Sequence, residues 1–265
     1  MDELHEFAGV CWLELSGLPH GIRAVVTTRL GGTSTGDYAS LNLGLHVGDD
    51  DDRVIENRRR IFSALDLDPH RAVFMNQVHG TRIATVTSDD HGRGLLAQDH
   101  ALVATDAMVT QELTTPIVAM SADCSPLLLV SRDGSSLGVA HAGWRGTAAS
   151  MAAHLVEAFC TWGHEPDDLQ AVVGPTISLE GYEVGSEVVD ALAAATPGDD
   201  SQWLHRGERF HVDVARANQA QLLAAGLREE NVRITQDRSD DELFFSDRRV
   251  RPCGRMALIA WRSEA

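Results

Sequence analysis

The feature that most constrains this chain is a pair of apolar runs on either side of an Asp-Gly turn. Residues 127–130 and 137–140 flank Asp133-Gly134, a pattern that predicts a β-hairpin. Because a hairpin brings the start of its first strand near the end of its second, Cys124 and His141 are expected to lie side by side. A thiol and an imidazole at one end of a hairpin indicate either a metal site or a Cys–His nucleophile pair.

A second histidine favours the metal site. His79 follows the apolar run 72–75 and is expected to end another strand. Two histidines and one cysteine form a donor set that zinc accepts, and three protein ligands leave the fourth position for water or substrate, as in catalytic zinc sites. The spacing between the three residues matches no short zinc motif, so the prediction depends on the fold bringing them together.

Length and charge restrict the class of protein. The 265 residues fit one large domain or two small ones, and the 43% of hydrophobic residues allow a sizeable core. The net charge of −17 opposes binding to nucleic acid and to anionic membranes. We therefore expect neither as a partner, and an anionic substrate would need a local basic pocket. The sequence does not indicate an oligomeric state.

The cysteines and the first residues suggest a cytoplasmic protein. The four cysteines show no regular spacing, so a disulfide framework is not expected. The first 16 residues lack the basic stretch and apolar core of a signal peptide, and no apolar run is long enough to span a membrane.

The order of the predicted elements favours a single mixed α+β domain, residues 1–265, over a doubly wound fold, because strands outnumber helices and several strands follow one another directly. Helices are predicted after the aspartates 49–52, from residue 146, over 184–195 and from Asp213 to residue 223. Strands are predicted at 10–15, 22–28, 83–87, 103–110, 117–120, 171–175, 232–235 and 256–261.

Two arginines are candidates for binding an anion. Arg145 lies between Gly143 and Gly146, where a helix is predicted to begin, and backbone donors beside a guanidinium favour an anion. Arg58 lies with Asn57 on the helix after the aspartates and could reach a site from there. A salt bridge explains either arginine equally well.

Three motifs resemble the signatures of the YfiH/YlmD family, the laccase-like group also described as purine nucleoside phosphorylases or peptidoglycan editing factors. They are QVHG at 77–80, ADCSP at 122–126 and HAGWRG at 141–146. Further segments that are similar to the family pattern lie at 27–32, 41–49, 56–58, 182–185, 221–222 and 244–249. The resemblance covers nearly the whole chain in order.

The resemblance implies one zinc ion bound by His79, Cys124 and His141. It implies a single mixed-sheet, layered α–β domain similar to the cytotoxic-necrotizing-factor deamidase and YfiH folds. It also implies phosphorolysis of adenosine, inosine and methylthioadenosine, together with adenosine deamination, so that the partners are a purine nucleoside and phosphate. The catalytic candidates are Asp123 and Cys124, and the candidates for binding substrate or phosphate are Arg145, Arg58, Asn42, Asn57 and Gln77.

Departures from the family pattern bear on the substrate preference. Thr176 stands where Cys or Ala is common, Asp247 replaces an aromatic residue, and Thr235-Gln236 lacks an upstream Cys-Thr pair. Two other classes of function stay open: a hydrolase, either a Cys124–His141 thiol enzyme or a zinc amidase that edits peptidoglycan precursors, and a non-catalytic zinc-binding scaffold. A polyphenol oxidase is disfavoured because multicopper oxidases need several histidine-rich copper centres.

Overall fold

The computed structural model describes residues 2–198 and 200–263. Its helices are α1 (Asp51–Ala64), α2 (Trp144–Ala148), α3 (Met151–Cys160), α4 (Ser186–Ala195) and α5 (Val214–Ala224). Its first eight strands are β1 (Glu3–Phe7), β2 (Val10–Glu14), β3 (Ile22–Thr27), β4 (Val73–Phe74), β5 (Ile83–Thr85), β6 (Ala107–Thr110), β7 (Ile117–Ser121) and β8 (Ser125–Ser131). The others are β9 (Leu137–Ala142), β10 (Leu169–Val173), β11 (Glu183–Val184), β12 (Leu204–Arg206), β13 (Phe210–Val212), β14 (Val232–Ile234) and β15 (Met256–Arg262).

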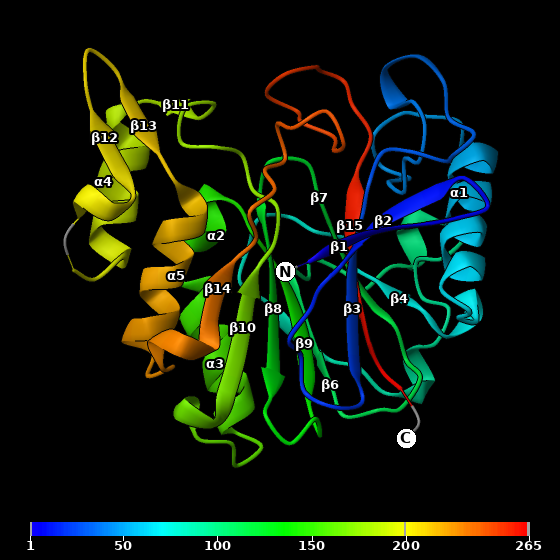
Figure 1. Ribbon diagram of the computed structural model, residues 1–265, viewed down its shortest axis with the longest axis horizontal. Coiled ribbons are helices and arrows are strands. Elements are labelled where there is room, and N and C mark those ends of the chain that lie inside the picture. Colours follow the sequence, from blue (N-terminus) through cyan, green and yellow to red (C-terminus); the bar gives the residue numbers. More distant parts are fainter. Residues whose placement is uncertain (1, 199, 264–265) are drawn as a thin grey trace.

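Two six-stranded mixed sheets form the middle of the molecule, and helices cover their outer faces (Figure 1). The first sheet has the order β1-β2-β3-β15-β7-β4 and the second the order β14-β10-β8-β9-β6-β5. Apolar side chains from both sheets, such as Val26 and Leu258 from the first and Leu128 and Val139 from the second, form one buried cluster between them. The central strands β7, β8 and β9 therefore bury both faces, which explains why they are nearly continuous apolar runs.

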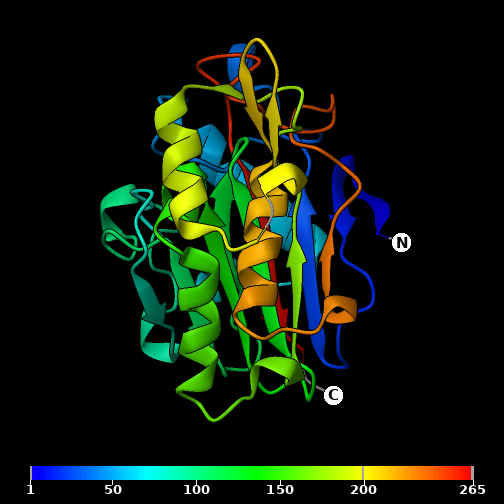
Figure 2. The ribbon, with the colours of Figure 1, turned by 90° about the vertical axis from the view of Figure 1, so that its left-hand side faces the viewer.

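The outer layers are amphipathic helices. Ile61 and Phe62 on α1 pack with the first sheet. Helices α3 and α5 bury their apolar faces against the second sheet, and Figure 2 shows these two helices in front of its strands. Helix α1 begins where the aspartates predict, because the Asp50 carboxylate accepts hydrogen bonds from the amides of Asp52 and Arg53. In the same way Asp213 caps α5, through the amide of Arg216 at 3.0 Å.

A smaller unit, which we call the cap, lies beside one end of α2 and α5 in Figure 1. It consists of α4 and the three-stranded sheet β11-β13-β12. Its apolar cluster includes Val188, Leu192, Trp203 and Val212, all with less than a tenth of their surface exposed. Contacts between α2 and α4 attach the cap to the HAGWRG segment.

The structure confirms the layered α+β fold and corrects its details. Two large sheets and a small one replace the single sheet, because buried apolar runs do not show which strands pair. The helix predicted from residue 146 is two helices, since Ser150 has a positive φ of 60°. The strand predicted over 103–110 begins only at Ala107, after a turn in which Ala104 has φ 47°. Strands β1, β11, β12 and β13 were not predicted. In the described residues, no helix is long and apolar enough to cross a membrane.

Candidate functional site

The β8–β9 hairpin brings Cys124 and His141 together as predicted. Ser125 pairs with Ala142 and Pro126 with His141, so Cys124 precedes the first strand beside the end of the second. His79 approaches from the loop after β4, with φ 60°. One potential ligand atom from each of the three residues lies within 4.8 Å of the others, and no other such group of three or more occurs in the described part of the chain.

Asp106, which the sequence analysis missed, connects these ligand segments. Its Oδ1 accepts hydrogen bonds from the His79 amide at 2.9 Å and from the His141 ring Nδ1 at 3.0 Å. Its Oδ2 accepts from the amides of Val78 at 3.1 Å and Gly80 at 2.8 Å. Because Nδ1 of His141 is occupied, Nε2 is the nitrogen available to a metal. The one feature of the sequence that could have indicated Asp106 is that a carboxylate lies within the otherwise uncharged stretch 105–110.

The charges of this cluster favour a deprotonated Cys124 and a protonated His141 before a metal binds. Burial acts to raise the pKa of the Cys124 thiol, but His141 and His79 outweigh it and lower that pKa. Burial acts to lower the pKa of His141, but Cys124 and Asp106 outweigh it and raise that pKa. Without a metal, the two groups are therefore poised as a thiolate and an imidazolium. A cation that binds between them replaces the imidazolium proton and keeps the thiolate.

Replacing Asp106 should weaken metal binding. Asp106→Asn keeps the shape of the side chain but replaces one acceptor oxygen with an NH₂ group that faces backbone N–H donors. We expect the Kd for Zn²⁺ to rise by about 10- to 100-fold, as for other partners that orient metal ligands. A competition titration with a chromophoric chelator measures it. Asp49→Asn, at another hydrogen-bonded carboxylate, is the matched control; wild-type zinc affinity in Asp106→Asn would contradict this role.

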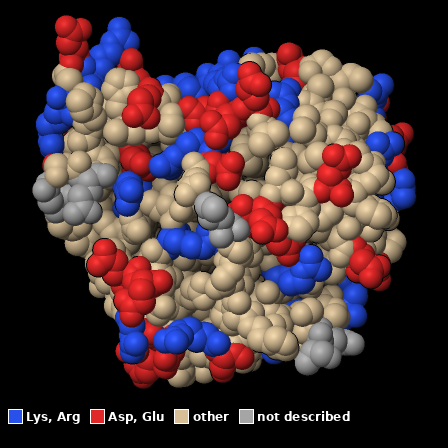
Figure 3. All heavy atoms as spheres, in the orientation of Figure 1, with Lys and Arg blue, Asp and Glu red and all other residues tan. Residues whose placement is uncertain are grey.

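A cavity of about 470 Å³ opens over the three potential ligands. Arginines and aromatic rings line it besides the ligand residues: Trp144, Arg145, Tyr182, Arg248, Arg251 and Arg255. The chain has a net charge of −17, and acidic and basic side chains are intermixed on the face shown in Figure 3. The excess of arginines in the cavity lining therefore contrasts with the charge of the whole chain. The cavity therefore meets the requirement of a local basic pocket for an anionic substrate.

Arg145 extends into this lining from α2. Its guanidinium carbon lies 4.3 Å from the Trp144 ring centroid, and no hydrogen bond or ion pair of its side chain occurs among the described residues. Helix α2 has only five residues. Its N-terminus therefore does not provide the anion site that we predicted from the start of a helix. The guanidinium itself carries the case for anion binding.

Asp123 lines the cavity in a strained conformation, with φ 87°. Its Oδ1 accepts a hydrogen bond from the Ser239 hydroxyl at 2.8 Å, and its Oδ2 accepts one from the Arg248 amide at 2.7 Å. Burial raises the pKa of this carboxyl. Asp123, which directly precedes Cys124, thus holds Ser239 and Arg248 against the cavity wall.

Three other candidates from the sequence make contacts with the backbone. Gln77 lines the cavity, but its amide bonds to both the N–H and the C=O of Met120. Arg58 is 1% exposed and donates to the carbonyls of Leu43, Gly94 and Leu95. Asn42 is fully buried and accepts from the amides of Gly44 and Arg255. Neither Arg58 nor Asn42 lines the cavity.

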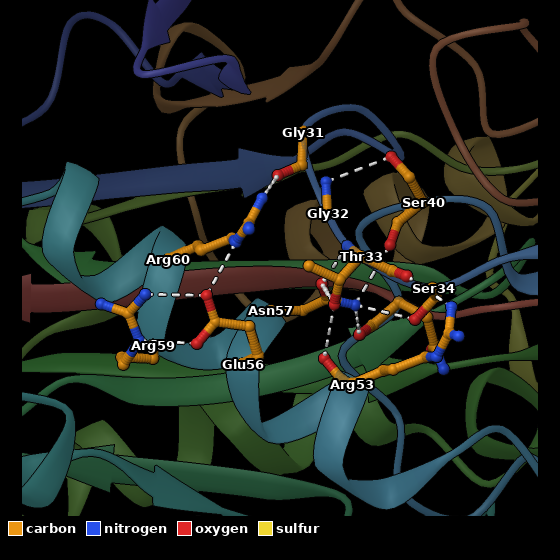
Figure 4. Close-up of polar contacts among 11 residues, drawn as sticks. Gly31, Gly32, Thr33, Ser34, Ser40, Arg53, Glu56, Asn57, Arg59 and Arg60 are labelled. Atoms are coloured by element: carbon orange, nitrogen blue, oxygen red, sulfur yellow. Dashed lines mark hydrogen bonds and ion pairs between the residues drawn. The ribbon is translucent and has the colours of Figure 1, made fainter.

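Asn57 organises a loop rather than the cavity (Figure 4). Its Oδ1 accepts from the Thr33 amide at 2.7 Å, and its Nδ2 donates to the Ser34 hydroxyl and the Ser40 carbonyl. The glycine-rich segment 31–36 is therefore fixed by side chains of α1. The exposed arginines of α1 pair with Glu56 in the same view.

Tyr182 and Arg248 line the cavity and were not among our site predictions. Both lie in segments that are similar to the family pattern. Burial, with the nearby Cys124, raises the pKa of Tyr182 to about 12, so its hydroxyl is protonated at neutral pH. The family pattern singles out their segments, but their place beside Cys124 is visible only in the folded chain.

Comparisons with known proteins show the family of this chain. The family model described as "Multi-copper polyphenol oxidoreductase laccase" matches residues 23–263. The chain belongs to this family. The resemblance of the three motifs to YfiH and YlmD is thereby confirmed, since the chain is 38% identical over 262 residues to "Purine nucleoside phosphorylase YlmD" of Geobacillus stearothermophilus, covering 96% of this chain and 95% of that protein.

A solved structure and a second relative are similar to this chain over nearly its whole length. The crystal structure of YlmD from Geobacillus stearothermophilus has a TM-score of 0.94 at 37% identity and covers 100% of both chains. "Adenosine deaminase RL5", from an unknown prokaryotic organism, is 34% identical over 242 residues, covering 90% of this chain and 92% of that protein. This chain is thus similar to enzymes whose names indicate purine nucleosides as substrates.

Proposed function

We propose that this protein is a zinc-dependent purine nucleoside phosphorylase that splits adenosine, inosine or methylthioadenosine with phosphate. We propose adenosine deamination as a second activity at the same site. The observation that carries the proposal is one basic cavity that contains both the His79–Cys124–His141 cluster and Arg145, a cation without an acidic partner in the described structure. The names of the relatives support the reaction class.

The residues present fit a zinc ion. Two imidazoles and a thiol with a lowered pKa form a donor set of borderline softness, and three protein ligands leave a position for substrate or water. Asp106 sets the His141 ring so that Nε2 is the donor. When bound, zinc would supply Lewis-acid stabilisation of negative charge that develops on the substrate.

The protein's own residues account for positioning. In phosphorolysis, a phosphate oxygen forms a bond to ribose C1′ while the C1′–N bond breaks, and the purine takes the electron pair. The proton that phosphate gives up balances the one that the base gains. We propose that Arg145 orients the phosphate, because bidentate guanidinium contacts suit its oxygens. We propose that Asp123 maintains the cavity wall next to Cys124.

Four other functions have weaker support. A multicopper oxidase needs several copper centres, whereas the described residues contain one cluster of three potential ligands. A hydrolase that uses a Cys124 thiolate is favoured by one observation, the lowered pKa of that thiol beside His141. An amidase acting on peptidoglycan precursors would use the same cavity, and a non-catalytic scaffold would leave its arginines without a function.

Metal analysis followed by a nucleoside screen tests the proposal. We expect about one zinc per chain and purine release that requires phosphate. Less than about a tenth of a zinc ion per chain after metal-replete expression, with no gain in activity when zinc is added, would contradict the zinc assignment. Purine release that is independent of phosphate would favour the hydrolase. Irreversible loss of activity on alkylation of the metal-free protein, with no protection by zinc, would favour the thiol enzyme.

A further inference from the structure

Two arginines of the cavity wall are stacked on aromatic rings that pack against the cap. Trp144 and Tyr182 both pack against the apolar cluster of the cap. The guanidinium carbon of Arg145 lies 4.3 Å from the Trp144 ring centroid, and that of Arg248 lies 4.9 Å from the Tyr182 ring centroid. Each arginine is therefore stacked on an aromatic ring that is itself fixed to the same unit.

These two arginines differ from the others that line the cavity. Arg251 and Arg255 both pair with Asp247. Arg145 and Arg248 have no carboxylate partner for their side chains in the described part of the chain. The lining thus contains two arginines that share one carboxylate and two arginines that have no carboxylate partner among the described residues.

The backbone fixes Arg248 at a point close to the ligand cluster. Its amide donates to Asp123, next to Cys124, and its Nη1 donates to the Glu183 carbonyl at 2.9 Å. Its Nη2 and Nε make no hydrogen bond to the described residues. The Tyr182 hydroxyl has no hydrogen-bond partner in the described residues, and the ring lies within electrostatic range of Arg248 and Arg145. The Arg145 guanidinium, two nitrogens of Arg248 and the Tyr182 hydroxyl thus have no acceptor among the residues that the structure describes.

We propose that Arg248 and Tyr182 form, with Arg145, a three-part binding site for the oxygens of inorganic phosphate. This inference rests on the proposed function, because it names the residues that would hold the second substrate of phosphorolysis. Two guanidinium groups suit a dianion better than one, and a neutral phenol adds a hydrogen bond without adding charge. The cap would then serve as the platform that holds the site rigid.

The same donors would suit a phosphate that is part of the substrate, such as the 5′-phosphate of a nucleotide. A neutral nucleoside carries no charge for these arginines to bind, whereas phosphorolysis requires inorganic phosphate in the same cavity. We therefore assign the site to inorganic phosphate. The two sources differ in a measurable way. A nucleotide site would bind adenosine 5′-monophosphate far more tightly than adenosine and would lose that preference in Arg248→Ala, while the affinity for inorganic phosphate stayed the same.

The test compares four variants of the zinc-loaded protein. Arg248→Ala removes the guanidinium, Arg248→Lys keeps the charge but not the planar fork, and Tyr182→Phe keeps the ring. Arg249→Ala is the matched control, since this neighbouring arginine lines a different cavity, with Arg29 and Phe245. Calorimetry gives the Kd of inorganic phosphate without turnover, and initial rates give the KM of phosphate and of inosine separately.

Arg248→Ala should raise the Kd and KM of phosphate on the order of 10- to 100-fold and leave the inosine KM within about threefold. Arg248→Lys should recover part of the loss, and Tyr182→Phe should raise the phosphate Kd roughly 3- to 10-fold. Zinc content and the control should match wild type.

An unchanged phosphate Kd in folded, zinc-loaded Arg248→Ala or Arg248→Lys would overturn the inference, as would the nucleotide pattern above. A wild-type protein that binds phosphate with this dependence but catalyses no phosphorolysis would refute the proposed function and keep the binding site.

Discussion

Cys124→Ala is expected to lose bound zinc and catalysis together while the protein stays folded. The thiol is one of three potential ligands, and with two imidazoles alone the site has lost its only anionic donor. We expect the zinc Kd to rise by at least about 100-fold and phosphorolysis to fall to the level of the metal-free protein. Metal analysis and initial rates on the same samples measure both.

Folding should survive this substitution because the core does not depend on the metal. The two sheets bury their apolar cluster independently of Cys124, unlike a zinc finger, which unfolds without its ion. Circular dichroism and the melting temperature check this, with Cys160→Ala, at an exposed cysteine, as the matched control. His141→Ala should behave like Cys124→Ala. If Cys124→Ala retains zinc and loses only turnover, the residue is a nucleophile and the thiol enzyme is the better account.

Arg145→Ala is expected to raise the phosphate KM, or to lower phosphorolysis, by on the order of 10- to 1,000-fold. A charge-assisted contact to phosphate contributes about 1.5–4 kcal/mol. The guanidinium has no competing carboxylate in the described structure and is positioned by Trp144. Zinc content should not change. Adenosine deamination, which uses no phosphate, should fall much less.

The comparison of the two reactions in one variant distinguishes binding from structure. Arg216→Ala, at an exposed arginine on α5 that bonds to Gln219, is the control and should leave both reactions unchanged. Equal losses of phosphorolysis and deamination in Arg145→Ala would show that Arg145 organises the site generally. Arg58 is then not the next candidate, because its guanidinium is buried among backbone carbonyls.

The ligand cluster could be predicted because local rules determine much of it. The Asp-Gly turn between apolar runs is a short-range signal, and it places Cys124 and His141 at the same end of one hairpin. The aspartate caps of α1 and α5 are local in the same sense. His79 required more, since its approach depends on the distant pairing of β4 with β7.

The remaining errors come from contacts that are remote in sequence. Arg58 is among three arginines in a row, and composition alone suggests a solvated face, yet three carbonyls from two other segments surround it. Asp106 has no motif of its own and acquires its function only because one loop, 78–80, presents three amides to it and His141 presents its ring nitrogen. Tyr182 and Arg248, which lie far apart in the sequence, become neighbours only in the folded chain.

The most direct test of the central claim is ³¹P NMR of the zinc-loaded protein with inosine and inorganic phosphate. We expect a ribose 1-phosphate signal to grow as phosphate is consumed, in a one-to-one ratio to the hypoxanthine released, with neither product formed by Cys124→Ala. Hypoxanthine released without any ribose 1-phosphate, or no release from protein shown to contain zinc and to bind phosphate, would contradict the account.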